Sequence, residues 1–113
     1  LDFSTSVCWL MKGHLQTVLT RNDVADLVGL GERTFQRRLA LDGRNFQELL
    51  DQARFEVARS RLSESEEPIT EIALDLGYND TANFSRAFRR WTGMSPRSYR
   101  STILSPIAKR PFS

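Results

Sequence analysis

The chain has 113 residues, of which 40% are hydrophobic and 27% charged, with a formal net charge of +2. This composition supports a packed core and excludes a disordered chain or a membrane protein, and the length allows one domain or two very small ones. The sequence contains no apolar run near the roughly 18–20 residues that cross a bilayer, and residues 1–10 carry no signal-peptide pattern.

Helical patterns dominate the first half of the chain. Apolar residues recur at helical spacing in residues 4–15, from residue 21 to near Gly29, and from residue 32 to near Gly43. The second of these helices should begin at a capping box formed by Thr20 and Asp23. The residues expected to face inward are Val7, Leu10, Met11, Leu15, Val24, Leu27, Val28, Phe35 and Leu39.

The second half is also helical. Residues 46–62 read as one long helix of about 25 Å, and a polar break follows at residues 63–67. A helix should begin near Pro68 and end at Gly77, and Asp80 should cap another that runs to about residue 91. A short helix should open at Pro96, and residues 101–113 should form an irregular tail. The residues expected to face inward are Phe46, Leu49, Leu50, Ala53, Val57, Ala58, Leu62, Ile69, Ile72, Ala73, Leu76, Phe84, Ala87 and Phe88.

Two segments of the chain share one residue pattern. Each has a helix with a small Ala, a tight turn with Gly, and a second helix, which is the layout of a helix-turn-helix whose second helix enters the DNA major groove. The repeat divides the chain into a first helix-turn-helix subdomain (1–45), a linker helix (46–62), a second subdomain (63–102) and a tail (103–113). The residues Ala25, Gly29, Phe35, Leu39, Gly43 and Leu49 recur as Ala73, Gly77, Phe84, Phe88, Gly93 and Tyr99.

Positive charge is concentrated towards the C-terminus. Residues 1–77 contain nine Lys/Arg and thirteen Asp/Glu, a balance of −4, whereas residues 78–113 contain seven and one, a balance of +6. A basic block of this kind suits a polyanion. Of the 16 basic residues 14 are Arg, whose planar fork matches phosphates and guanine edges, although a GC-rich genome that favours Arg codons explains the same bias.

Polar residues opposite the expected core faces are candidates for contacts with double-stranded DNA. Base-reading candidates lie in both copies, because Arg pairs with guanine and Asn or Gln with adenine, and a solvated polar face is the alternative. They are Arg33, Gln36, Arg37, Thr81, Asn83 and Arg86. Candidates for phosphate contacts are Arg38, Arg89, Arg90, Arg97 and Arg100.

The sequence offers little for catalysis or metal binding. Cys8 is the only Cys and His14 the only His, which excludes a zinc site of the usual ligand number and makes a Ser/His/Asp arrangement implausible. It has no glycine-rich loop of the kinds that bind nucleotide phosphates. We expect Cys8 to be buried in a protein of a reducing compartment, and we expect no metal, no cofactor and no enzymatic activity.

Two stretches resemble a known family. The residues Ile69–Tyr78, Asp80, Phe84–Arg90, Gly93, Ser95-Pro96 and Tyr99-Arg100 resemble the signature of AraC/XylS-type transcription regulators, and Leu30–Leu39 resemble the first recognition helix of that family. The resemblance covers about residues 5–102. It implies an all-α fold of seven helices, with two helix-turn-helix subdomains joined by one long helix. It also implies that the six base-reading candidates occupy base-reading positions, and that the two recognition helices enter major-groove segments about one turn, ~34 Å, apart on one DNA face.

Two positions depart from the family pattern. Gly31 stands where the family often has a capping Ser, so the first recognition helix should start less firmly. Ala82 stands where a small polar residue is common, which leaves an apolar contact with a thymine methyl.

The resemblance also implies a cytoplasmic, nucleoid-associated bacterial protein, with RNA polymerase as a candidate partner. Many such regulators carry an N-terminal effector-binding or dimerisation domain, so we expect this chain to be the C-terminal part of a longer protein. A short stand-alone member of the family is the alternative.

Two other functions fit the sequence. The acidic run Glu64, Glu66, Glu67, Glu71 and Asp75 is either a solvated surface or the docking face of a helical protein-interaction module. Binding of RNA or DNA through charge alone is the third hypothesis, and it predicts equal affinity for random and selected duplexes.

Overall fold

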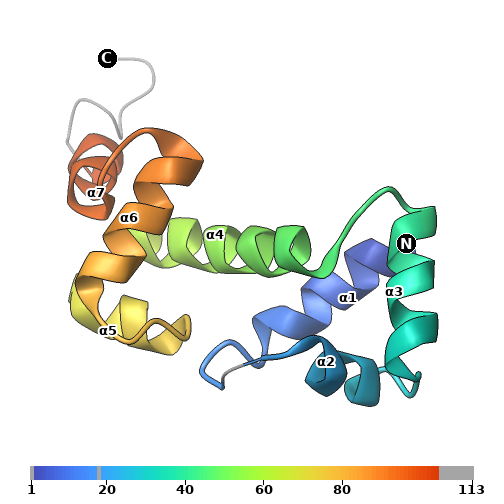
Figure 1. Cartoon of the computed structure of the whole chain (residues 1–113). Helices are drawn as coiled ribbons and strands as arrows, with labels where there is room; N and C mark the ends of the chain where they lie inside the picture. Colours follow the sequence, from blue (N-terminus) through green and yellow to red (C-terminus); the bar gives the residue numbers. More distant parts are fainter. Residues whose placement is uncertain (1, 18, 105–113) are drawn as a thin grey trace. The chain divides into compact units, whose positions relative to one another are not determined.

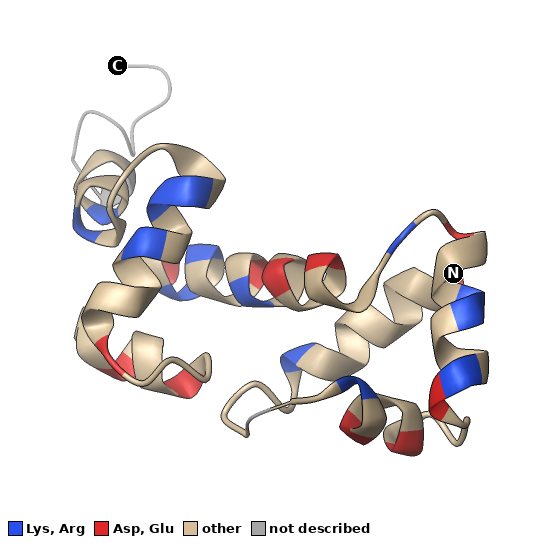
Figure 2. Cartoon of the chain, viewed as in Figure 1, with Lys and Arg blue, Asp and Glu red and all other residues tan. Residues whose placement is uncertain are grey.

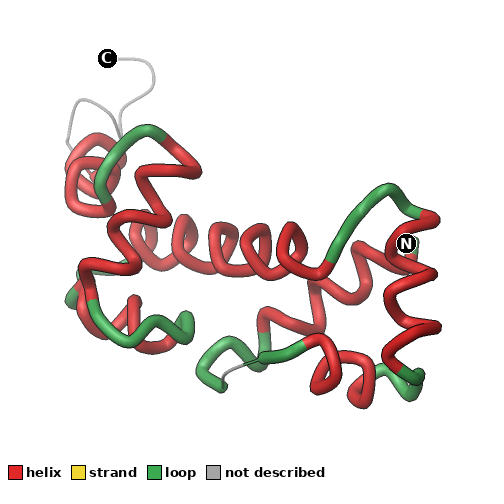
Figure 3. The backbone as a smooth tube through the Cα atoms, in the orientation of Figure 1, coloured by secondary structure: helices red, strands yellow, loops and turns green. Residues whose placement is uncertain are grey.

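In the computed structural model the described residues, 2–17 and 19–104, fold into helices joined by short loops, with no strand among them (Figures 1 and 3). The all-α prediction is therefore confirmed. The seven helices of this part are α1 (Phe3–Lys12), α2 (Arg21–Leu27), α3 (Glu32–Leu41), α4 (Phe46–Glu64), α5 (Ile69–Asp75), α6 (Thr81–Thr92) and α7 (Pro96–Leu104).

The chain forms two compact units, residues 1–56 and residues 57–113. The boundary lies inside α4, so the first part of this helix belongs to one unit and its last part to the other. The first unit contains the pair α2 and α3, and the second contains the pair α5 and α6. The finer division into residues 1–45, 46–62, 63–102 and 103–113 stays a prediction, and residues 105–113 lie outside the described part of the chain.

The core of the first unit is formed by α1, α2, α3 and the start of α4. Phe35 of α3 is fully buried, and its ring lies 6.0 Å from that of Phe3 in an edge-to-face arrangement. Cys8 is buried as predicted, and its Sγ donates a weak hydrogen bond, 3.9 Å long, to the carbonyl oxygen of Leu49. The remaining buried apolar residues of this unit are Val7, Met11, Leu15, Val24, Ala25, Leu39, Leu49, Leu50 and Ala53.

The core of the second unit is aromatic. The Phe88 ring lies 5.8 Å from that of Phe84 and 5.2 Å from that of Tyr99, both in edge-to-face contacts, and Tyr78 lies 5.7 Å from Phe84. Aromatic pairs at these distances add to the free energy of burial. The other buried residues around them are Ala58, Leu62, Ile72, Ala73, Leu76, Ala87 and Pro96.

Leu27 of α2, expected to be buried, is exposed. Leu27 is 46% exposed, although the sequence pattern placed it with Val24 on the inward face of α2. The buried face of this seven-residue helix is formed by Val24 and Ala25, and at about 100° per residue Leu27 turns away from it. The prediction for Leu27 was therefore wrong.

Most helix starts agree with the sequence. The Thr20 hydroxyl accepts from the Asp23 backbone N–H at 3.1 Å while the Asp23 carboxylate accepts from the Thr20 N–H at 2.9 Å, which confirms the capping box. The Asp80 carboxylate accepts from the Asn83 N–H at 2.8 Å, which confirms the predicted cap of α6. Gly31 has no side chain to cap α3, as the sequence indicated.

The boundaries of three helices differ from the predictions. Helix α1 begins after a cap by Asp2 and ends at Lys12, and α4 continues to Glu64. Helix α7 runs to Leu104, so the prediction of an irregular tail was wrong for residues 101–104. Residues 97–104 contain neither Gly nor Pro, and the Thr102 hydroxyl donates to the Ser98 carbonyl at 3.0 Å within the helix.

The two helix-turn-helix turns are closed by equivalent hydrogen bonds. The Leu30 N–H donates to the Ala25 carbonyl at 2.9 Å, and the Tyr78 N–H donates to the Ala73 carbonyl at 3.0 Å. Gly29 (φ 74°) and Gly77 (φ 95°) adopt the left-handed backbone that this closure requires. The repeat seen in the sequence is therefore also a repeat of backbone geometry.

We predict opposite stability effects for one substitution at two neighbouring glycines. Gly31→Ser should stabilise the protein by about 0.5–1 kcal/mol, because Gly31 caps α3 with an extended backbone (φ −71°) that serine adopts and its hydroxyl can cap the helix. Thermal unfolding followed by circular dichroism measures the effect as a rise in Tm.

Gly29→Ser is the matched control. A Cβ at either glycine meets nothing within 4 Å, so the two sites differ in backbone conformation and in the cap that a hydroxyl offers at residue 31. The positive φ of Gly29 should make this change destabilising by about 1–2 kcal/mol. Equal Tm shifts for the two variants would contradict the backbone argument.

Candidate nucleic-acid interface

Helix α3 turns an arginine-rich face outward. Its buried residues Phe35 and Leu39 fix the rotation of the helix, and Arg33 and Arg37, four residues apart, lie exposed on the opposite side. Gln36 is also exposed, nearer to the flank. The structure therefore brings together the three residues predicted to read bases in the first copy.

A hollow beside Gln36 adds two cationic residues that the sequence reasoning did not select. It has a volume of about 180 Å³ and is lined by Gln36, Arg21 at the start of α2, and Arg44 after α3, among others. Arg44 donates to the Gln52 side chain. Arg21 is the first residue of α2, where the free backbone N–H groups of a helix favour anions, and this position was the available signal in the sequence.

Arg38 lies on the flank of α3. Its guanidinium carbon is 4.4 Å from the centroid of the Phe3 ring, a cation–π contact with α1. The residue stays exposed, so the contact orders the side chain and leaves its charge at the surface. This position is compatible with the predicted phosphate contact.

Helix α6 carries the second basic face, which appears in Figure 2 as two basic segments along the helix. Phe84, Ala87 and Phe88 are buried, so at about 100° per residue the outward face is centred on the exposed residues Arg86 and Arg89. The other residues of this helix that matter here are Thr81 and Asn83, both half-buried on its flanks, and Arg90, which is exposed.

Two further residues of α6 bear on base reading: Ala82, for which the sequence left a contact with a thymine methyl, and Ser85, which was not a candidate. Phe84 and Phe88 match Phe35 and Leu39 at an offset of 49 residues, so Ala82, Ser85 and Arg86 occupy the positions of Arg33, Gln36 and Arg37. The 49-residue offset, which is visible in the sequence, would have identified Ser85 as the equivalent of Gln36. Helix geometry places Ala82 and Arg86 near the centre of this face and Ser85 and Asn83 on its flanks, so the base-reading roles of Thr81, Asn83 and Arg86 stay predictions.

Asn83 is tied to two other residues of the second unit. Its backbone N–H is capped by Asp80, and its side-chain oxygen accepts a hydrogen bond from the Arg86 guanidinium, one turn further along the same helix. The amide oxygen of Asn83 is therefore in use before any DNA is present.

The two arginines of α7 differ from each other. Arg97 is exposed in the first turn of the helix, as a phosphate contact requires. Arg100 instead donates to the backbone carbonyls of Glu67 at 2.7 Å and Leu62 at 3.2 Å, with a longer contact of 3.5 Å to that of Arg61. These bonds join α7 to the end of α4 and the loop after it, and they engage donors that a phosphate contact would use; the phosphate contact of Arg100 stays a prediction that this geometry disfavours.

The acidic run does not form a single surface. The Arg61 guanidinium donates to the carboxylates of both Glu67 and Asp75, and Ser65 adds a hydroxyl bond of 2.9 Å to Glu67. The hydrogen bonds from Arg61, followed by that from Ser65, lower the pKa of Glu67 from 4.5 to about 2. Glu67 and Asp75 are therefore half-buried partners of Arg61 within the second unit, and this weakens the hypothesis that the run is a docking face.

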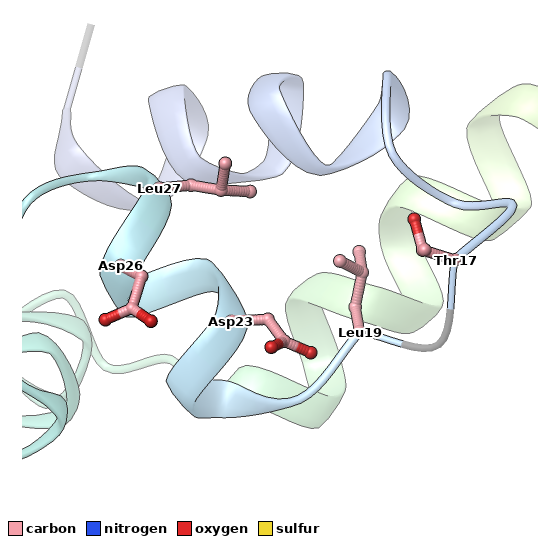
Figure 4. Close-up of a pocket in the computed structure, with 5 residues that line it drawn as sticks. All are labelled: Thr17, Leu19, Asp23, Asp26 and Leu27. Atoms are coloured by element: carbon pink, nitrogen blue, oxygen red, sulfur yellow. The ribbon is translucent and has the colours of Figure 1, made fainter.

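A separate hollow in the first unit is acidic. It measures about 410 Å³ and is lined by Asp23, Asp26 and Leu27 of α2 together with Thr17 and Leu19 of the preceding loop (Figure 4). Two carboxylates at its edge repel a polyanion. The charge of this hollow is therefore opposite to that of the outward faces of α3 and α6.

Residues 2–17 and 19–104 contain no cluster of three or more His, Cys, Asp or Glu side chains that would hold a metal ion. Across the same residues, no helix combines the length and the apolar character needed to span a bilayer.

These two units, each with a tight-turned helix pair and an exposed basic second helix, define a helix-turn-helix DNA-binding domain, and the comparisons agree. Residues 24–102 match the family model described as "Helix-turn-helix domain". The chain is similar to the AraC-type regulator domain of known structure from Chromobacterium violaceum, with a TM-score of 0.78 and 25% identity over 90% of this chain and 92% of that one. The chain belongs to the AraC family of DNA-binding transcription regulators.

Two further relatives bear on function. The DNA-binding domain of AdpA, solved in complex with a target DNA, gives a TM-score of 0.77 with 27% identity and covers 100% of both chains. The HTH-type transcriptional regulator VqsM of Pseudomonas aeruginosa is 42% identical over 79 residues, which are 70% of this chain. The chain spans only 24% of the length of VqsM.

The Glu67 carboxylate should make the stability of the protein depend on acid pH. A pKa that is lower in the folded state stabilises the fold above the unfolded value, so this contribution should be lost as pH falls from about 4.5 towards 2. Glu67→Gln should therefore lower Tm at neutral pH and flatten the decline of Tm over this window, as measured by thermal unfolding at several pH values.

Glu66→Gln is the matched control, because it removes an exposed carboxylate next to Glu67. We expect its profile to follow that of the wild type. Parallel profiles for the Glu67 variant and the wild type would show that the Arg61 network does not control acid stability.

Proposed function

We propose that this chain binds specific double-stranded DNA sites through α3 and α6, as the DNA-binding part of a bacterial transcription regulator. The observation that carries the proposal is the same in both units: an apolar stripe buries one side of the second helix and turns arginines outward on the other. A helix with this division of faces fits the major groove, and two such helices fit successive groove segments.

The residues divide into two groups by their place on the helices. Residues near the start of a recognition helix reach base edges, whereas charges further along it or on neighbouring helices neutralise phosphates. We assign base reading to Arg33, Gln36, Arg37, Ser85 and Arg86, with Ala82 placed for a thymine methyl. We assign phosphate contacts to Arg21, Arg38, Arg89, Arg90 and Arg97.

We further propose that the regulator that contains this domain is longer than the chain. The relatives are several times its length, so the remainder of the protein has room for an effector-binding or dimerisation domain. A regulator of this kind acts in the cytoplasm at the nucleoid, and RNA polymerase is the partner through which bound DNA would affect transcription.

The decisive experiment is selection from a random duplex library at about physiological salt, followed by sequencing. Two short enriched blocks about one helical turn apart would support base reading by both units, and one block would restrict base reading to a single unit. No enrichment, with the domain shown to be folded, would overturn the proposal. Equal affinity for random and selected duplexes with a steep salt dependence would favour binding through charge alone.

Replacing an outward arginine should relax sequence preference locally. Arg37→Ala and Arg86→Ala should each cost about 1–3 kcal/mol on the selected site, because each removes a bidentate contact with a guanine edge. Each variant should lose discrimination at one base pair, and the two base pairs should lie in different blocks of the selected site. Titration of duplexes with single base-pair changes measures this. Unchanged binding by both variants would show that the recognition faces are misassigned.

The two α7 arginines provide a matched pair. Arg97→Ala should weaken binding to all duplexes alike and reduce the slope of log affinity against log salt by about one, with Tm unchanged. Arg100→Ala should lower Tm instead, because it removes the bonds to the carbonyls of Leu62 and Glu67. A reduced salt slope with unchanged Tm for the Arg100 variant would restore this residue to the phosphate contacts.

A further inference from the structure

We infer that Asn83 does not read a base but positions Arg86 to read one. This inference rests on the proposed function, since it concerns how α6 recognises DNA. It revises the expectation from the sequence, in which Asn83 paired with adenine.

Asn83 lies in the first turn of α6 and is held at its backbone and at its side chain. Its backbone N–H is held by the Asp80 carboxylate at 2.8 Å, and its side chain is half-buried on the flank of the helix. Arg86 is three residues further on, at the spacing at which helical side chains meet. A guanidinium only donates hydrogen bonds, so the Asn83 atom that faces it must be the amide oxygen, as the structure has it.

This bond restricts adenine recognition. Bidentate pairing with adenine needs the amide oxygen to accept from N6 and the amide NH₂ to donate to N7 at the same time. In Asn83 the oxygen accepts from Arg86 and faces along the helix. Its second lone pair is still able to accept from adenine, but only with the amide held in the orientation that the bond from Arg86 sets.

The same bond suits guanine recognition by Arg86. The guanidinium has five N–H donors in a rigid fork, so one bond to Asn83 leaves two adjacent donors for guanine O6 and N7. Binding normally costs the conformational freedom of an exposed, flexible side chain such as Arg86. A side chain already held by Asn83 loses less freedom on binding, and the guanidinium plane is aimed in advance.

The test compares Asn83→Ala, Arg86→Ala and the double variant on the selected site and on duplexes with single base-pair changes. Asn83→Ala should reduce discrimination about 2- to 10-fold at the base pair that Arg86 reads, the effect of losing one hydrogen bond. The effects of the two substitutions should be clearly less than additive in the double variant.

Asn83→Asp separates positioning from base reading. A carboxylate still accepts from Arg86 but cannot donate to adenine N7. If Asn83 positions Arg86, the Asp variant should keep discrimination at that base pair, even though its negative charge weakens binding to all duplexes. Thr34→Ala, at the matching position of α3, should leave discrimination in the α6 block unchanged.

A second readout needs no DNA. Relaxation of the Arg86 Nε–H signal in NMR spectra of the free protein should show an ordered side chain in the wild type and the Asp variant, and a mobile one in the Ala variant. This measurement responds to positioning and not to base contacts.

The outcomes distinguish the inference from the proposed function. If Asn83→Ala relaxes a base pair that Arg86→Ala leaves intact, Asn83 reads its own base and the inference fails. If Asn83→Ala changes neither discrimination nor the mobility of Arg86, the inference also fails. Failure of the proposed function would appear in the wild-type protein itself, as an absence of any preferred site.

Discussion

The burial of one apolar stripe on each second helix is the constraint on which the rest of the structure depends. Phe35 and Leu39 in α3, and Phe84 and Phe88 in α6, are at most 1% exposed. Because side chains on a helix are fixed relative to one another, burying these residues determines which polar residues face outward. The same apolar contacts that stabilise each unit therefore also present its arginines to a ligand.

The tight turn before each of these helices brings the preceding helix against the apolar stripe. The Ala25 and Ala73 side chains are fully buried, and their carbonyls accept the bonds that close the two turns. A small residue there lets the paired helices approach closely. Because the two turns share this geometry, residues of α3 and α6 that are 49 positions apart occupy equivalent outward positions.

The arginines of the second unit have two different uses. Arg61 and Arg100 bind carboxylates and backbone carbonyls and hold α4, α5 and α7 together, whereas Arg86, Arg89, Arg90 and Arg97 lie exposed. Arginine suits both tasks because its planar fork satisfies several acceptors at once. The net charge of residues 78–113 is therefore an upper limit on the positive charge that this segment presents to a nucleic acid.

The amino-acid sequence by itself determined the features that depend on neighbours within about one helical turn. These are the seven helices, the caps at Thr20 and Asp80, most of the inward stripes and the repeat, because capping and periodicity act between residues a few positions apart. Only the tertiary structure decided which side of the short helix α2 is buried, and so exposed Leu27. It also assigned Arg100 to carbonyls more than 30 residues away. Such choices depend on where a long, flexible side chain finds its partner once the helices have packed, and no local pattern in the sequence records that.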